Sequence, residues 1–182
     1  MTPAVPSRSL GISEVLRAYS SAVSELRLRH SARAIVLDER DSILLCRFDV
    51  PEGAMWATPG GGVEAGETVI AALRRELREE VGLEVDTPPH VWHRQIVAPG
   101  HMRGFDGVVE DYFLVRTTAF EPNGALSAAE LAAENIAEFR WWRWAEITAY
   151  RGPDLFAPRC LVRALIDLLR DGVPAHPVEL GW

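Results

Sequence analysis

Lysine is absent from this chain of 182 residues, and all 19 of its basic residues are arginine. The chain therefore cannot carry a Schiff-base lysine or the lysine of a Walker A phosphate-binding loop. Any side-chain cation that binds a phosphate group must be an arginine or a protonated histidine. A GC-rich genome produces the same arginine bias, and the alanine-rich composition fits that simpler explanation.

Cysteine is scarce, and long apolar runs are missing. Cys46 and Cys160 match no metal or redox spacing, so both are expected to be reduced packing residues. No uncharged apolar run approaches the roughly 20 residues that span a bilayer, and residues 1–15 contain no apolar signal segment. We therefore expect a cytoplasmic protein. The net charge of −7 argues against nonspecific binding to nucleic acid or to an anionic membrane.

The length and composition fit one ordinary domain. With 182 residues and 48% apolar content, the chain is long enough for one hydrophobic core, and a second domain is not expected. An amphipathic pattern from Ile12 to about Leu28 predicts a helix, so residues 1–30 are interpreted as an N-terminal helical extension. Residues 31–182 then form the main domain. Whether the extension packs on this domain or on a partner is left open.

The most regular pattern runs from Gly61 to Leu83. Thr68 is suited to an N-cap and Gly82 to a C-terminal cap, which predicts a helix over residues 68–80. At about 100° per residue, the apolar side chains fall on one stripe that can be buried. This stripe comprises Val69, Ile70, Leu73, Leu77 and Val81.

Three glutamates line the neighbouring edge of this predicted helix. Glu76, Glu79 and Glu80 stand at positions i, i+3 and i+4, where like charges repel by a few tenths of a kcal/mol per pair. A hard divalent ion such as Mg²⁺ or Mn²⁺ would remove the repulsion. An acidic helix edge is otherwise usually a solvated face. The helix also has three arginines, which the helical period places on its far side: Arg74, Arg75 and Arg78.

A glycine-rich turn leads into the acidic helix. Within Trp56 to Glu64, the residues Gly60, Gly61 and Gly62 allow positive φ and a close backbone approach to a ligand. Such a turn can present a carbonyl to a metal and N–H groups to phosphate. Because the turn directly precedes the acidic helix, a binding site is favoured over a solvated face.

The spacing G-x5-E-x7-R-E-U-x-E-E-x-G-U, with U aliphatic, is satisfied at every fixed position, and it resembles the signature of the Nudix hydrolases. The fixed positions are Gly61, Glu67, Arg75, Glu76, Leu77, Glu79, Glu80, Gly82 and Leu83. The resemblance covers roughly residues 31–170. It implies a metal-dependent pyrophosphohydrolase, a hydrolase of phosphorus-containing anhydrides, on an α/β/α sandwich with a mixed central sheet.

The resemblance also implies roles for single residues. Arg75 would orient the glutamates and balance their charge. Glu64 and Glu67 would pair with Arg75, hold a second metal, or simply cap the helix and solvate the loop. The ligands of Mg²⁺ or Mn²⁺ would be Glu76, Glu79, Glu80 and the carbonyl of Gly61.

The general base is left open between four further carboxylates and the glutamates of the signature. Glu110 and Asp111 lie on a predicted strand, and Glu134 and Glu138 lie shortly before another. Glu138 is slightly favoured, because glutamates at this place resemble the loop carboxylate that some family members use. A carboxylate within hydrogen-bond reach of the attacking water would settle the assignment.

The remaining pattern alternates strands and helices, which on its own predicts an α/β/α sandwich. Ser127 to Glu130 fits a capping box within a polar connection. Strands are expected over residues 32–37, 42–48, 91–97, 108–117 and 139–144, a loop over 98–107, and a closing helix over 158–170.

Substrate residues are less strongly indicated. Trp56 and Phe105 are candidates to stack on a base, and Gly60 and Gly62 are candidates to contact phosphate. Pro99 lies sixteen residues after the signature, as in some family members that cleave ADP-ribose. This weakly favours ADP-ribose or a nucleotide sugar, followed by oxidised nucleoside triphosphates. The expected partner is a small nucleoside diphosphate derivative, without nucleic acid or membrane, and a homodimer is left open.

The histidine residues receive a simpler interpretation. His90, His93 and His101 do not have the spacing of a helical metal-binding pair, so they are interpreted as polar strand and loop positions.

Two alternative functions belong to other classes. One is a Nudix-like module that senses a nucleotide without cleaving it, although here the acidic helix is complete. The other is an isopentenyl diphosphate isomerase, which uses a cysteine, but no motif of that kind surrounds Cys46. Product analysis separates them, since the outcomes are no turnover, an isomer, or two phosphate-bearing fragments.

Overall fold

A computed structural model describes residues 26–51, 53–102 and 104–181 of the chain. The helix expected from Ile12 to about Leu28 lies almost entirely outside these residues. At its end the expectation is wrong, because Leu28 begins a strand that pairs with a neighbouring strand.

Strands outnumber helices along the chain. The order is β1 (Leu28–Leu37), β2 (Ile43–Val50), β3 (Gly53–Ala57), β4 (Gly60–Gly62), α2 (Val69–Glu80), β5 (His90–Met102), β6 (Phe105–Arg116), α3 (Ala128–Ala133), β7 (Ile136–Trp142), α4 (Trp144–Ala149), β8 (Leu155–Phe156), α5 (Leu161–Asp171) and β9 (Val178–Glu179).

The strands form one mixed sheet in the order β8-β3-β2-β1-β6-β5-β9, with β4 paired to β1 and β7 paired to β2. β1 runs parallel to β6 along its whole length. β1 pairs antiparallel with β2 where Leu37 faces Ile43. The earlier part of β1, from Ser31 to Arg33, pairs antiparallel with β4. β1 and β2 therefore diverge, and the glycine turn lies at the opening between them.

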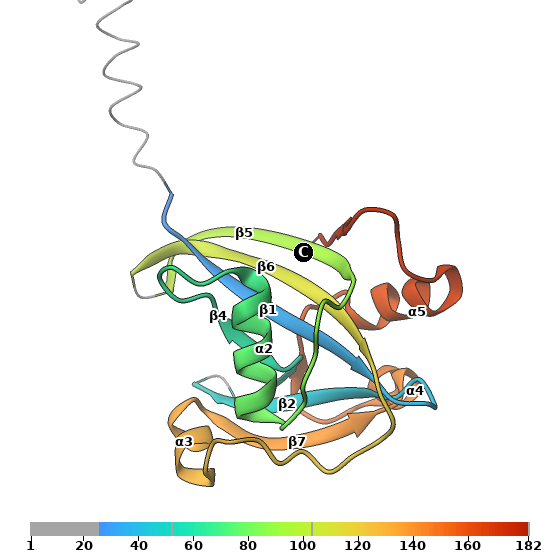
Figure 1. Cartoon of the computed structure of the whole chain (residues 1–182). Coiled ribbons are helices and arrows are strands. Elements are labelled where there is room, and N and C mark those ends of the chain that lie inside the picture. Colours follow the sequence, from blue (N-terminus) through green and yellow to red (C-terminus); the bar gives the residue numbers. More distant parts are fainter. Residues whose placement is uncertain (1–25, 52, 103, 182) are drawn as a thin grey trace, which may run out of the picture.

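Two hydrophobic cores lie on the two faces of the sheet. α2 packs on one face through Leu73 and Leu77, against Ala34 and Phe113 among others. α5 packs on the other through Leu161 and Leu165, in a core that also includes Trp142. In Figure 1, α2 crosses in front of β1, and α4 and α5 lie to one side. The arrangement confirms the expected α/β/α class with a mixed sheet.

The caps predicted at Thr68 and Ser127 are confirmed, whereas the closing helix begins at Leu161 rather than at residue 158, and α4 begins at Trp144, where a strand was expected. The Thr68 side chain caps α2 by accepting from the Ala71 N–H at 3.1 Å. Ser127 and Glu130 form the predicted capping box at the start of α3. The hydrogen bonds of a cap join residues close in sequence, so the local pattern is enough to predict them.

The loop expected over residues 98–107 is wrong. β5 continues to Met102 and β6 begins at Phe105, so the two strands form one long hairpin. Gly104, with φ of 84°, lies at the turn. Near the base of this region, a Cβ on Gly107 would come within 3.0 Å of the Ile96 carbonyl. Backbone pairing, which the apolar pattern does not reveal, extends the strands.

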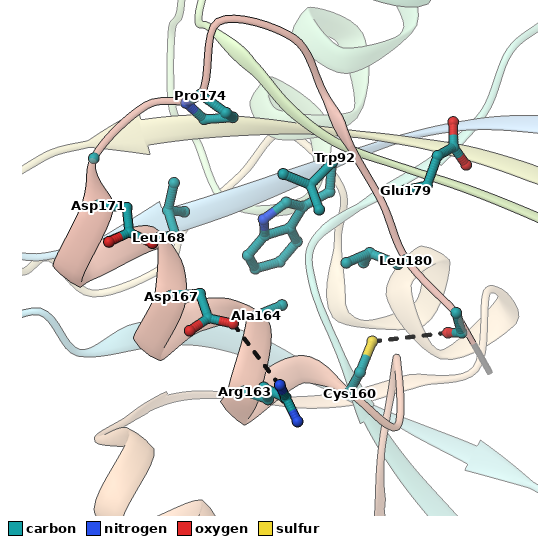
Figure 2. A pocket seen from close by; sticks show the side chains of 13 residues that line it. Trp92, Cys160, Arg163, Ala164, Asp167, Leu168, Asp171, Pro174, Glu179 and Leu180 are labelled. Carbon is teal, nitrogen blue, oxygen red and sulfur yellow. Dashed lines mark hydrogen bonds and ion pairs between the residues drawn. The ribbon is translucent and has the colours of Figure 1, made fainter.

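A cavity of about 370 Å³ lies between α5 and the C-terminal segment that contains β9. Trp92, Leu168 and Leu180 contribute apolar walls, and Cys160 and Asp171 lie at its side (Figure 2). The α5 core forms its floor, so this cavity is separate from the glycine turn. Within the described residues, none of the helices is both long enough and apolar enough to cross a membrane.

Candidate active site

A second and more polar cavity, of about 600 Å³, lies at the opening where β1 and β2 diverge. Its wall combines the glycine turn, the C-terminal half of α2, and the junction of α3 with β7. The charged and glycine residues of this wall are Arg29, Arg33, Gly60, Gly61, Gly62, Glu64, Arg75, Glu76, Glu80 and Glu134.

Three carboxylates converge in this cavity. Glu76, Glu80 and Glu134 each offer an oxygen, and these oxygens all lie within 4.8 Å of one another. Glu76 and Glu80 are buried on one edge of α2, one helical turn apart, whereas Glu134 is exposed. An all-oxygen set of this kind fits Mg²⁺ or Mn²⁺, which prefer carboxylate ligands.

Glu80 is buried, and its pKa is shifted by this burial. Its carboxyl is 2% exposed and accepts a hydrogen bond from the Gly60 N–H at 2.8 Å. Burial raises the pKa of Glu80 to about 8, and this hydrogen bond only partly opposes the shift. Burial also raises the pKa of Glu76, although Arg75 opposes it. Glu80 therefore needs a proton or a cation near neutral pH.

Arg75 holds this cluster together. Its Nε and Nη2 atoms donate to the two oxygens of Glu67, each at 3.1 Å. Nη1 donates to Glu76 at 2.8 Å and to Glu79 at 3.3 Å, and Nη2 also donates to the Gly62 carbonyl at 3.0 Å. The helical period placed Arg75 on the far side of α2, which is wrong for its guanidinium, because the long side chain reaches around the helix. Its contacts with Glu76 and Glu79 agree with the charge balance that the resemblance implied.

The glycine turn approaches the glutamates closely. Gly60 has φ of 120°, and a Cβ there would come within 3.0 Å of the Ala32 carbonyl. A Cβ on Gly61 would collide with the carboxylate of Glu76. Only glycine at position 61 leaves room for that carboxylate, so the Gly61 backbone lies beside the proposed ligands.

Glu134 is positioned by the end of α2. The N–H groups of Asn123, Ala125 and Leu126 donate to the carbonyls of Val81, Arg78 and Glu79 at 3.0–3.2 Å, which anchors the segment that enters α3. Glu134 is the C-cap of α3, where the chain turns toward β7. Thus the same helix end fixes both Glu80 and the approach of Glu134.

The other base candidates lie elsewhere. Glu138 is exposed on β7 and pairs across the strands with Arg47, outside the cavity wall formed by the described residues. Glu110 is engaged by Arg94 at 2.8 Å and by the Tyr112 hydroxyl at 2.9 Å. Burial raises the pKa of Glu110, but the neighbouring Arg33 and Arg94 outweigh it and hold that pKa below its usual value.

Asp111 has histidine partners instead. Burial disfavours its ionised form, yet hydrogen bonds with His93 and His30 keep the pKa of Asp111 below its ordinary value. Successive side chains of a strand face opposite sides, so Asp111 and Glu110 lie on different faces of the sheet.

Two arginines of the cavity were not singled out from the sequence. Arg33 donates to the Gly60 carbonyl through Nη1 and lies 3.6 Å from Glu110. Arg29 lines the same cavity and, among the residues that the structure describes, forms no ion pair. The two stand four positions apart at the start of a strand, so they share one face. The alternation of side chains along a strand was therefore the sequence signal that could have placed both arginines at one site.

The stacking candidates do not reach the cavity. Trp56 is 3% exposed, packs edge-on against Trp142 at 5.1 Å between ring centroids, and donates to Asp154 at 2.9 Å. Its ring has no free face for a base. Phe105 begins β6, with the Arg27 guanidinium over its ring. Of the described residues, the aromatic side chain in the cavity wall is Phe48.

Comparisons with known proteins identify the family of this chain. A family model described as the NUDIX domain matches residues 27–163. The RNA pyrophosphohydrolase of Caulobacter vibrioides is 33% identical over 116 residues, which cover 57% of this chain and 61% of that protein. The RNA pyrophosphohydrolase of Erythrobacter litoralis is 29% identical over 134 residues, which cover 67% of this chain and 78% of that protein.

Solved structures show the same fold. The solution structure of the E. coli ORF135 protein aligns with a TM-score of 0.61 and 23% identity, over 85% of this chain and 99% of that one. At this identity the likeness establishes the fold alone. The family model spans most of the chain, and the chain therefore belongs to the NUDIX domain family.

Proposed function

We propose that this chain hydrolyses a diphosphate linkage in a nucleotide derivative, with Mg²⁺ or Mn²⁺ as the cofactor. The observation that carries the proposal is the convergence of Glu76, Glu80 and Glu134 beside the glycine turn. Two of these carboxylates are buried, where an uncompensated charge is costly. A divalent ion in this position would compensate both.

Glu76 and Glu80 would hold the ion, and Glu79 and the carbonyl of Gly61 are the further proposed ligands. When bound, such an ion withdraws charge from the phosphate oxygens and lowers the pKa of water. Arg75 acts as a positioning residue, because it joins the carboxylates to Glu67 and to the turn. Gly62 remains the proposed phosphate contact of the turn, whereas the expectation for Gly60 is wrong, because its N–H already donates to Glu80.

Glu134 is proposed as the general base that takes the proton from the attacking water. It is the exposed member of the three-carboxylate group, so water has access to it. Glu138, which the sequence slightly favoured, lies beside Arg47 and is the weaker candidate.

Arg29 is proposed to bind the substrate phosphates. Its guanidinium lines the cavity without an ion-pair partner among the described residues, whereas Arg33 is engaged by Glu110. A guanidinium fits the geometry of phosphate oxygens and carries its charge at any working pH. Phe48 and Met55 give the cavity an apolar wall for the nucleoside.

Two substrate classes are proposed. ADP-ribose or a nucleotide sugar, followed by an oxidised nucleoside triphosphate, fits the small polar cavity. The curated relatives, which are named RNA pyrophosphohydrolase, favour the 5′-terminal pyrophosphate of an RNA as the second class. The net charge of −7 opposes extended contact with an RNA backbone, so binding would be confined to the terminus.

The isomerase alternative conflicts with the position of Cys46. Its side chain lies fully buried in β2, and burial raises the pKa of its thiol well above the ordinary value. A thiol in this state cannot exchange a proton with a substrate carbon in the cavity. The sensor alternative predicts binding without cleavage and is separated by turnover.

The test is a turnover assay with Mg²⁺ or Mn²⁺ on ADP-ribose, nucleotide sugars, oxidised and ordinary nucleoside triphosphates, and a 5′-triphosphate RNA. Activity should require the metal and should be lost in Glu76→Gln. Cleavage of the RNA alone would select the second class. Binding without cleavage by folded wild-type protein would reject the hydrolase proposal in favour of the sensor.

A further inference from the structure

Three histidines converge on Asp111, on the opposite face of β6 from Glu110. His93 Nδ1 lies 2.7 Å and His90 Nε2 lies 3.0 Å from Oδ1 of Asp111, and His30 Nε2 lies 2.6 Å from Oδ2. His30 comes from β1, Asp111 from β6, and the other two from β5. These are neighbouring strands, and the proposed hydrolysis uses none of these side chains.

Three of the four residues have the arrangement of a metal site. His90, His93 and Asp111 each offer one ligand atom, and these atoms all lie within 4.8 Å of one another. Two imidazoles and one carboxylate form a ligand set that holds Zn²⁺ in proteins while leaving positions for water. Nitrogen ligands favour Zn²⁺ and related transition metals, whereas the all-oxygen glutamate site favours Mg²⁺ or Mn²⁺.

The surroundings hold these ligands in place. The His90 ring stacks on Phe113, with 4.8 Å between ring centroids and 24° between planes. His30 occupies the second oxygen of Asp111, as outer partners of metal ligands do. The histidine side chains are 27–42% exposed and Asp111 is 10% exposed, so an ion can enter from solvent and meet a largely buried carboxylate.

The hydrogen bonds of the histidine rings are also compatible with metal binding. His90 Nε2 lies between two acceptors, Asp111 Oδ1 and the Trp92 carbonyl at 2.9 Å, so it carries a proton in this structure. Metal binding replaces that proton, which moves to the other ring nitrogen or to solvent. The same exchange occurs at His93 Nδ1, which faces a carboxylate oxygen.

We propose that His90, His93 and Asp111 bind one divalent transition-metal ion, with Zn²⁺ as the best match, and that His30 positions Asp111 for it. The site is independent of the proposed hydrolase site, because the two sites share no residue. A bound ion links β5 to β6 directly and, through His30, to β1. It therefore also stabilises this part of the sheet.

The experiment titrates Zn²⁺ by calorimetry into the full chain carrying Glu76→Gln and Glu80→Gln, which disables the glutamate site. Co²⁺ in place of Zn²⁺ reports nitrogen ligation by its visible absorption. One equivalent should bind, and millimolar Mg²⁺ should not displace it. Failure of this folded variant to bind either ion would overturn the proposal without touching the hydrolase proposal.

Substitutions in the same background locate the ion. His93→Gln and His90→Gln should each weaken binding by more than the 10–100-fold typical of outer partners, and His30→Gln should fall in that range. His176→Gln, at an exposed position outside the cluster, is the matched control and should bind normally. Circular dichroism confirms folding of each variant. Equal affinity in the control and in both ligand variants would overturn the assignment.

Discussion

The Gly60 N–H donates to a Glu80 carboxyl that is almost completely buried, at 2.8 Å. This hydrogen bond joins the glycine turn to the C-terminal end of α2 and places the carboxyl in the proposed metal site. Burial nevertheless opposes ionisation of this carboxyl in the folded state and raises the pKa of Glu80 to about 8.

We expect the metal-free chain to lose stability as the pH rises. The folded pKa of Glu80, about 8, exceeds its unfolded value of 4.5, so the folded state binds the additional proton between these values. The contribution is complete below pH 4.5 and is lost as the pH rises through 8. Between pH 6 and pH 9 the free energy of unfolding should fall by roughly 2–3 kcal/mol.

Thermal melts in EDTA at the two pH values measure this change. Glu80→Gln, which keeps an acceptor for Gly60 but does not titrate, is the control and should show a much smaller fall. Mg²⁺ should restore the stability of the wild type at pH 9, because it replaces the proton. An equal pH dependence in wild type and Glu80→Gln would show that another group is responsible.

Glu134→Gln should lower kcat by roughly 10²–10⁴-fold and change KM little, because a base acts in the transition state. Glu138→Gln is the matched control on the neighbouring strand and should retain near wild-type kcat. Steady-state kinetics at saturating Mg²⁺ measures both. The reverse result would restore Glu138 as the base.

Gly61→Ala should raise the Mg²⁺ concentration needed for half-maximal activity by about 10–100-fold, as for a disturbed metal site. The reason is steric, since the new Cβ would collide with the carboxylate of Glu76. Gly66→Ala is the control, because its φ of 83° costs about 1 kcal/mol of stability while its Cβ meets open space. If the two variants need the same Mg²⁺ concentration, Gly61 does not shape the site.

Arg29→Gln should lower kcat/KM by about 10–100-fold through lost phosphate binding, with little change in melting temperature. Arg33→Gln should instead lower stability by about 1–3 kcal/mol, because it leaves Glu110 and the Gly60 carbonyl without this partner. Kinetics and thermal melts on both variants separate the roles. A stability loss confined to Arg29→Gln would contradict the proposed division.

The helix caps and the apolar face of α2 could be predicted from local sequence alone. Thr68 and the apolar stripe of α2, like the capping box at Ser127, depend on hydrogen bonds and side-chain periods that span a few residues. The same stretch brings Glu76 and Glu80 onto one helix edge, so the centre of the site could be predicted. The family followed from nine fixed positions in this one segment.

Which distant residues join that segment depends on tertiary packing. Glu134 was one of four similar carboxylates, and the packing of its loop on the end of α2 brings it to Glu80. Trp56, which was a candidate to stack on a base, instead packs in the core against Trp142. Asp111 and the histidines near it come from three strands whose registers depend on long-range pairing. Local periodicity carries no information about such registers, because they are fixed only when the whole sheet forms.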